Sequence, residues 1–167
     1  MVLTKNCNHE GSTLSWCGNC GFSWAPGKKE TVTQASTNVK VYIAGSFNDK
    51  DRIKPYRDQL RNLGFKVRSS WLDTPQINSF VGMTEAVKRQ EAQRDFNEID
   101  EADFVIVDTT TPSSSGGYEI ETGYALGLGK RFMLVGPAHN VFHTLAGKQF
   151  VTWEECLAHL SDHAHRR

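Results

Sequence analysis

A glycine-rich segment at the start of a helix carries the carboxylates most suited to chemistry in this chain. Residues 116–130 read GGYEIETGYALGLGK, so Glu119 and Glu121 lie close to the start of a helix of small residues. The dipole and the exposed N–H groups of a helix start favour an ionised glutamate, which suits a nucleophile and equally suits a simple helix cap. Residues two apart point in directions roughly 200° apart on a helix. We therefore expect one glutamate to line a site and the other to face solvent or a partner.

Several polar residues are expected at the same edge of the fold. Residues 102–108 (ADFVIVD) form a buried strand that ends in a carboxylate, and ligands of open α/β sheets bind outside the carboxyl ends of such strands. The first strand, residues 39–44, is followed by Gly45 and Ser46, whose backbone N–H groups and hydroxyl can bind an oxygen-rich ligand. The common dinucleotide and nucleoside triphosphate motifs, GxGxxG and GxxxxGK(S/T), are absent from the sequence.

The amino-terminal cysteines predict a metal site. Cys7 and His9 form one close pair of donors, and Cys17 and Cys20 form a second pair in a Cys-x-x-Cys motif followed by glycine. Four such donors satisfy tetrahedral zinc and leave no open position, so the zinc would be structural and catalysis would need no cofactor. The alternatives are a tail with free thiols or, less favoured, a redox dithiol. Cys156, on the last predicted helix, is interpreted as a small core residue.

The elements that must position these residues follow an alternating pattern. Short apolar runs predict strands, and periodic segments predict helices; the strands are residues 39–44, 65–67, 102–108 and 132–135, and the helices are residues 49–62, 85–100, 117–129 and 152–160. Thr152 and Glu155 form a capping box. Residues 69–82 are expected to be a loop over the site. The alternation predicts a doubly wound, mainly parallel α/β sheet of the flavodoxin or Rossmann type.

Length and composition limit the organisation and the partners. The 167 residues allow one domain with a small appendage: a zinc segment (1–24), a polar linker (25–38) and an α/β domain (39–163). Lys plus Arg equals Asp plus Glu, 19 each, so no global field attracts nucleic acid or an acidic membrane. Residues 1–8 lack the apolar core of a secretory signal, and no run of about 18 apolar residues occurs, so we expect a cytoplasmic protein.

Three motifs together resemble the nucleoside 2-deoxyribosyltransferase family. They are VYIAGS around Tyr42, RDFNEI with Asp95 followed by ADFVIVD, and ETGYALGLGK beginning at Glu121. Individually, Asp95 would be taken for a solvated charge and Tyr42 for an ordinary strand aromatic. The resemblance covers residues 39 to about 160, with the motifs in the family's order. Its last motif selects Glu121 over Glu119 as the nucleophile.

The resemblance implies cleavage of the N-glycosidic bond of a 2'-deoxynucleoside or its 5'-monophosphate. Glu121 would attack the anomeric carbon and form a glycosyl ester, Tyr42 would hold Glu121 by a hydrogen bond, and Asp95 would give a proton to the departing base. Transfer to a second base makes the enzyme a transferase, whereas transfer to water makes it a hydrolase.

The family pattern also suggests residues for the rest of the substrate. The position six before the nucleophile is Ser115, as in the related deoxynucleoside 5'-monophosphate hydrolases, so Ser115 with Ser46 and the N–H groups of Gly45 and Gly117 could bind a phosphate. A neighbouring subunit completes the pocket in the family, which implies a homodimer or larger assembly. His143 is the candidate for that role, and its alternative is a surface-loop histidine.

Trp71, in the loop over the site, is expected either to stack on the base or to fill the core.

Three functional hypotheses remain open from the sequence. The leading one is deoxyribosyl transfer between nucleobases, and the nearest rival is an N-glycosidase acting on a 5'-monophosphate. The third is a binding module that senses a nucleotide signal and docks a partner through its zinc segment. Only Lys5, Lys28 and Lys29 lie near the cysteines, which is a weak footprint for nucleic acid.

Overall fold

The computed structural model describes residues 14–16, 22–24, 38–75, 82–113 and 115–164. The chain divides into two compact units, residues 1–33 and residues 34–167. In the first unit, β1 (Leu14–Trp16) pairs antiparallel with β2 (Phe22–Trp24), with Leu14 opposite Trp24. The sequence pattern gave no indication of this hairpin. The predicted zinc ligands Cys7, His9, Cys17 and Cys20, and residues 25–37 of the predicted linker, lie outside the described residues.

The second unit is built on a five-stranded parallel sheet in the order β4-β3-β5-β6-β7. The strands are β3 (Lys40–Ala44), β4 (Lys66–Val67), β5 (Phe104–Asp108), β6 (Arg131–Val135) and β7 (Lys148–Phe150). Numbered within this unit, the order is 2-1-3-4-5, which is the flavodoxin-like arrangement. The α/β fold with a parallel sheet predicted from the sequence is therefore confirmed.

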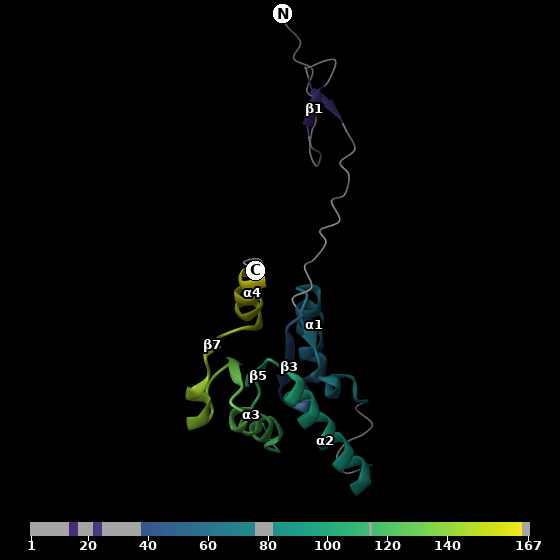
Figure 1. Cartoon of the computed structure of the whole chain (residues 1–167), viewed down its shortest axis with the longest axis vertical. Helices are drawn as coiled ribbons and strands as arrows, with labels where there is room; N and C mark the ends of the chain where they lie inside the picture. The colour runs from purple at the N-terminus through teal and green to yellow at the C-terminus, as the bar shows by residue number, and fades with distance from the viewer. Residues whose placement is uncertain (1–13, 17–21, 25–37, 76–81, 114, 165–167) are drawn as a thin grey trace, which may run out of the picture. The chain divides into compact units, whose positions relative to one another are not determined.

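Helices cover both faces of this sheet (Figure 1). Helices α1 (Lys50–Asn62) and α4 (Trp153–Ala164) contact each other, and so do α2 (Glu85–Glu101) and α3 (Gly117–Gly127). From β3 the chain adds β4 on one side, and after β4 it crosses back to add β5 and β6 on the other side of β3. Because the crossovers are right-handed, α1 lies on one face of the sheet, and α2 and α3 lie on the other. The core lies between these layers, where residues 41–44 of β3 and 105–107 of β5 are fully buried.

The predicted bounds of the α-helices and strands in the second unit agree with the structure to within a few residues. Strand β7 and the 3-10 helix η4 (Val141–Leu145) that precedes it were not predicted, nor were the 3-10 turns at residues 47–49 and 70–73. Strand β7 has only three residues, and two of them are exposed, so its apolar pattern is too short to indicate a strand. Half of the predicted capping box of α4 is present: the Glu155 N–H donates to Thr152 Oγ1 at 3.3 Å, but the Glu155 carboxylate accepts from the N–H of Val151, one residue before the cap, at 2.9 Å.

Candidate active site

The candidate site lies at the carboxyl ends of β3 and β5, where the order of the strands reverses. β4 and β5 pair with β3 on opposite sides. After β3 the chain passes toward β4, and after β5 it passes toward β6 in the opposite direction, so the segments that leave these two strands diverge. Gly45 begins the segment after β3. A Cβ at this position would lie 2.8 Å from Ile53 Cδ1 and 3.4 Å from Asp108 Cβ, so the absence of a side chain lets this turn pack closely against α1 and β5.

The predicted hydrogen bond between Tyr42 and Glu121 is present. Tyr42 is fully buried on β3, and its hydroxyl donates to Glu121 Oε1 at 3.0 Å. Glu121 lies in the second turn of α3. Its other oxygen, Oε2, is buried and has no hydrogen-bond partner among the described residues. One carboxylate oxygen is thus held in place while the other is available to a ligand.

Asp95 reaches the same place from α2. It is half-buried, and its Oδ1 has no hydrogen-bond partner in the described part of the chain, although Arg94 Nη2 lies 3.8 Å away. Burial raises the pKa of Asp95 to about 7, against the opposing effect of Arg94. A carboxyl group in this range can carry a proton at neutral pH and release it to a substrate.

Burial and the neighbouring Asp95 raise the pKa of Glu121 to about 8, while the Tyr42 hydrogen bond acts in the opposite direction. Burial and the negative charge of Glu121 also raise the pKa of Tyr42, so the phenol stays protonated and donates. Because both pKa values are raised, and the negative charge of Asp95 contributes to that of Glu121, the pair retains about one proton near neutral pH; the higher pKa of Glu121 favours that proton on Glu121 in the free enzyme. This arrangement provides one group for nucleophilic attack and one for proton transfer.

Trp71 fills the core beside β3. It belongs to the 3-10 helix η2 (Ser70–Asp73), is only 6% exposed, and donates its indole N–H to Ile43 O at 2.7 Å. Of the two interpretations made from the sequence, this packing matches the core role. The preceding Ser69 accepts the N–H of Ile43, so both backbone groups of Ile43 bond to side chains beyond the short strand β4.

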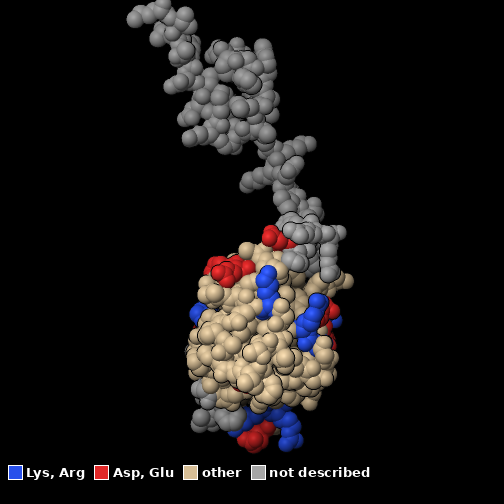
Figure 2. All heavy atoms as spheres, turned by 90° about the vertical axis from the view of Figure 1, so that its left-hand side faces the viewer, with Lys and Arg blue, Asp and Glu red and all other residues tan. Residues whose placement is uncertain are grey.

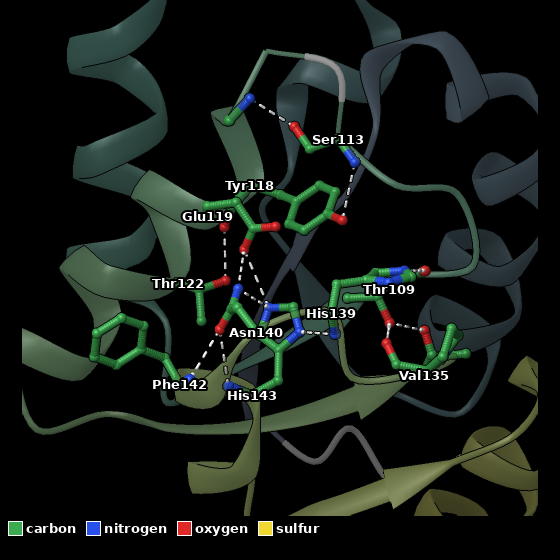
Figure 3. Close-up of polar contacts among 12 residues, drawn as sticks. Thr109, Ser113, Tyr118, Glu119, Thr122, Val135, His139, Asn140, Phe142 and His143 are labelled. Carbon is green, nitrogen blue, oxygen red and sulfur yellow. Dashed lines mark hydrogen bonds and ion pairs between the residues drawn. The ribbon is translucent and has the colours of Figure 1, made fainter.

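Glu119 and Glu121 have different partners, as the helical geometry predicts, but the Glu119 carboxylate bonds to side chains of its own chain, where solvent or a partner was expected. Figure 3 shows the contacts of Glu119. Its Oε2 accepts from Asn140 Nδ2 at 3.0 Å and lies 3.1 Å from His143 Nε2. His143 Nδ1 accepts the N–H of His139 at 3.1 Å, so its proton resides on Nε2, facing Glu119. His143 is 2% exposed, so it lies in a buried network of its own chain and is no surface-loop residue.

Ser113 forms two hydrogen bonds in the loop before α3 (Figure 3). Gly116 adopts φ +75°, in the left-handed region, and its N–H donates to Ser113 Oγ at 2.7 Å. The Ser113 N–H in turn donates to the Tyr118 hydroxyl at 3.1 Å. Ser115 and Gly117 are exposed at this turn. Ser46 is half-buried after β3 and forms no side-chain capping bond.

Asp108, the carboxylate that ends β5, is used within the fold. Its Oδ2 accepts from Trp153 Nε1 at 2.6 Å, and its Oδ1 accepts from Arg52 at 3.1 Å and from the backbone and hydroxyl of Thr110. These bonds join β5 to α1 and α4 and leave Asp108 1% exposed. Cys156 is buried on α4 as expected, and burial raises the pKa of its thiol to about 12.

Glu98 is a site residue that the sequence analysis missed. It lies one helical turn after Asp95, and its Oε2 accepts the N–H of Ser70 at 2.9 Å. Its spacing of three from Asp95 was a usable signal, but the many other charges of this helix obscured it. Among the described residues, no cluster of three or more His, Cys, Asp or Glu has the arrangement of a metal site.

Comparison with known proteins identifies the family. The family model for nucleoside 2-deoxyribosyltransferase matches residues 41–154, so the chain belongs to this family. The protein is therefore an enzyme of the glycosyltransferase or N-glycosyl hydrolase type. No curated protein sequence shows significant similarity to the chain.

Solved structures share the fold. A 2-deoxyribosyltransferase from Bacillus psychrosaccharolyticus is 21% identical over 71% of this chain and 90% of its own, with a TM-score of 0.60. A CMP N-glycosidase from Clostridium botulinum is 22% identical over 72% of this chain and 97% of its own, with a TM-score of 0.50. None of the helices in the described residues has the length and apolar character required to cross a membrane.

Proposed function

We propose that the protein cleaves the N-glycosidic bond of 2'-deoxynucleosides and transfers the deoxyribosyl group to another nucleobase through a covalent intermediate on Glu121. The observation that carries the proposal is the buried Glu121 carboxyl, held at Oε1 by Tyr42 and unpartnered at Oε2, beside Asp95. The family membership of the chain supports the same reaction class.

The first step needs one proton on the pair, located on Asp95; because the pKa of Glu121 is the higher of the two, this reactive form is the minor arrangement of the singly protonated pair in the free enzyme. With the proton on Asp95, Glu121 is ionised and its Oε2 attacks the anomeric carbon of the sugar. The carbon–nitrogen bond breaks, its electron pair stays on the base, and Asp95 transfers its proton to that base. The products of this step are the free base and a deoxyribosyl ester of Glu121.

The second step reverses the first with a different acceptor. An incoming base attacks the anomeric carbon, loses its proton to Asp95 and releases the Glu121 carboxylate. Throughout, Tyr42 donates to Oε1 and orients Oε2 toward the sugar. If water takes the place of the base, the same residues catalyse hydrolysis.

A second candidate function is an N-glycosidase that releases free base from a nucleoside 5'-monophosphate. Two turns favour it. The turn with Ser115 and Gly117 is exposed, and the turn with Gly45 and Ser46 is half-buried. Their hydroxyl and N–H groups are donors suited to a phosphate. A binding module without chemistry is the third candidate; the retention of Tyr42, Asp95 and Glu121 together argues against it.

Product analysis distinguishes these candidates. The purified protein is incubated with deoxynucleosides and with their 5'-monophosphates, each with and without a second base, and the products are separated by chromatography. A new deoxynucleoside formed only with the second base supports transfer, whereas free base from a monophosphate alone supports the N-glycosidase. Absence of turnover on every substrate, with Glu121→Ala as the inactive control, would favour the binding module.

We propose further that a second copy of the chain contributes to each site. Four exposed apolar side chains belong to the two elements that carry the buried Glu119–His143 network: Ile120 on α3, and Val141, Phe142 and Leu145 on η4. Figure 2, which faces the side of the molecule that carries β7 in Figure 1, shows a broad surface largely free of charged side chains. A shared interface here would bring the η4 segment near the sugar end of a partner's site, with the buried His143 supporting that segment from within its own chain.

The assembly is tested by sedimentation of the wild type and of Phe142→Asp. Phe142 is 63% exposed, so the substitution leaves the monomer fold intact and should produce monomers with reduced turnover. Val87→Asp, at an exposed residue on α2, is the matched control and should sediment as the wild type does. A wild-type monomer with full activity would contradict the shared site.

The amino-terminal segment is proposed to bind one structural zinc ion through Cys7, His9, Cys17 and Cys20. Metal analysis of the purified protein should give one zinc per chain, lost in Cys17→Ser. Because the zinc would have only a structural role, its removal should leave the chemistry of Glu121 unchanged. A metal-free protein would contradict the proposal. The cytoplasmic location stays a prediction.

A further inference from the structure

Glu98 connects the catalytic helix α2 to the turn that borders β3. Its Oε2 accepts the N–H of Ser70, which is 28 residues away in the sequence. On α2 it follows Asp95 by three residues, so both side chains lie on the same face of the helix. The Glu98 carboxylate therefore bonds to the Ser69–Trp71 turn from the face of α2 that also carries Asp95.

That turn supports the strand that carries Tyr42. Ser69 Oγ accepts the N–H of Ile43, and Trp71 Nε1 donates to the carbonyl of Ile43, the residue directly after Tyr42. Strand β4 ends at Val67, so these side chains complete the hydrogen bonding of β3 where the neighbouring strand no longer does. The bond from Glu98 to Ser70 fixes this turn from the side of α2.

The charge of Glu98 is not neutralised by an ion pair within the described residues. On α2, Arg94 pairs with Glu91 and lies 3.8 Å from Asp95. On η2, the only carboxylate is Asp73, which pairs with Arg57 of α1 at 2.7 Å. Among the described residues, the charge of Glu98 also acts on Tyr42 from β3 and on Glu121 from α3.

The effect of this charge is consistent across the site. The negative charge of Glu98 contributes to the raised pKa of Asp95, to that of Glu121 and to that of Tyr42. Glu91 acts only on Asp95 in the same sense, and Arg94 acts in the opposite sense. Glu98 is thus the residue outside the proposed catalytic set whose charge acts on all three of its members.

We propose that Glu98 is a positioning residue with two roles: it holds the Ser69–Trp71 turn against α2, and it places a negative charge on the helix face of Asp95 that keeps one proton on the Asp95–Glu121 pair at neutral pH. The inference rests on the proposed function, because the proton it retains is the one that Asp95 transfers to the base. No direct contact of Glu98 with substrate is required.

The test separates charge from hydrogen bonding by a substitution that keeps the shape of the side chain. In Glu98→Gln, the amide oxygen still accepts from Ser70, but the negative charge is lost. The matched control is Glu101→Gln on the same helix, where the carboxylate is exposed and pairs with Lys40 and Arg68. The carboxyl carbons of Asp95, Glu98 and Glu121 are followed by 13C NMR during pH titration of the full-length protein without substrate.

Loss of the neighbouring charge makes ionisation of Asp95 and Glu121 easier, so their titration midpoints should fall in Glu98→Gln by about half a pH unit to one unit. Glu101→Gln should leave both midpoints unchanged. In the wild type, the Glu98 carbon should also respond when the pair loses its proton, and this measurement does not depend on the folding of a variant. Unchanged midpoints, or a Glu98 signal insensitive to the pair, would overturn the proposal.

The kinetic consequence is a displacement of the whole pH profile. Because Glu121 must be ionised and Asp95 protonated, both limbs of kcat/KM should shift to lower pH in Glu98→Gln. A purely structural role would lower kcat and leave the limbs in place, which would also count against the proposal. If the wild type converts no nucleoside or nucleotide, the proposed function fails, while the NMR titration still decides the role of Glu98.

Discussion

The buried carboxyl of Glu121 should make the folded protein less stable at alkaline pH, and Glu121→Gln should relieve that cost. In the folded state, burial and Asp95 raise the pKa of Glu121 from 4.5 to about 8. A carboxyl whose pKa is raised by folding stabilises the folded state most below its unfolded pKa, and that contribution is lost as the pH rises through the folded pKa. The window of interest therefore extends from about pH 4.5 to about pH 8.

The size of the effect follows from the difference between the two pKa values. At about 1.4 kcal/mol per pH unit, the rise from 4.5 to about 8 corresponds to a ceiling of about 5 kcal/mol. Ionisation of Asp95 is coupled to that of Glu121, so removing one member also eases ionisation of the other. A glutamine keeps an oxygen that accepts from Tyr42, so the substitution changes the charge with little change in packing.

Urea unfolding of the wild type and of Glu121→Gln at about pH 5 and about pH 9 measures this effect. We expect the variant to gain about 2 to 5 kcal/mol relative to the wild type between these two pH values, while catalysis is abolished. Glu85→Gln, at a carboxylate with 86% exposure, is the control and should show no pH-dependent gain. A stability difference for Glu121→Gln that does not change with pH would refute the claim that the carboxyl is buried at a cost.

Three further substitutions test the site. Tyr42→Phe removes the bond to Glu121 Oε1 and should lower kcat/KM about 10- to 100-fold. Because this bond lowers the pKa of Glu121, its loss should also move the acid limb of the kcat/KM profile to higher pH. An unchanged profile would contradict the orienting role. Asp95→Ala should slow release of the first base in single-turnover kinetics far more than it weakens substrate binding, and an effect on binding alone would exclude the acid role. Trp71→Ala should reduce the free energy of unfolding by about 3 to 5 kcal/mol in urea titration; a raised KM at unchanged stability would favour base stacking instead.

The sequence was most informative where a residue's role depends on local pattern. The helices and the longer strands of the α/β unit follow from periodicity, and the alternation of elements predicts the parallel sheet. The convergence of Tyr42, Asp95 and Glu121 followed from the family motifs, because each comes from a different element and none is distinctive alone. The opposite directions of Glu119 and Glu121 follow from helix geometry, and the structure confirms them.

Features that depend on tertiary packing were not predictable. Asp108 ends a strand at the site edge, yet its oxygens are occupied by Trp153 and Arg52, which are distant in the sequence. The burial of His143 against Glu119 likewise depends on how η4 packs on α3. Glu98 is one of many charges on α2, and its bond with the Ser70 N–H, which depends on the tertiary fold, distinguishes it from the others.

The central claim is that Glu121 is the nucleophile, and trapping the glycosyl-enzyme tests it most directly. The protein is mixed with a deoxynucleoside or its 5'-monophosphate in the absence of a second base, quenched in acid after a short time, and examined as an intact chain and as peptides by mass spectrometry. The account predicts an added deoxyribosyl group, or its 5'-phosphorylated form, on the peptide that contains Glu121, and no adduct in Glu121→Gln. Turnover without any adduct, or an adduct on another residue, would contradict it.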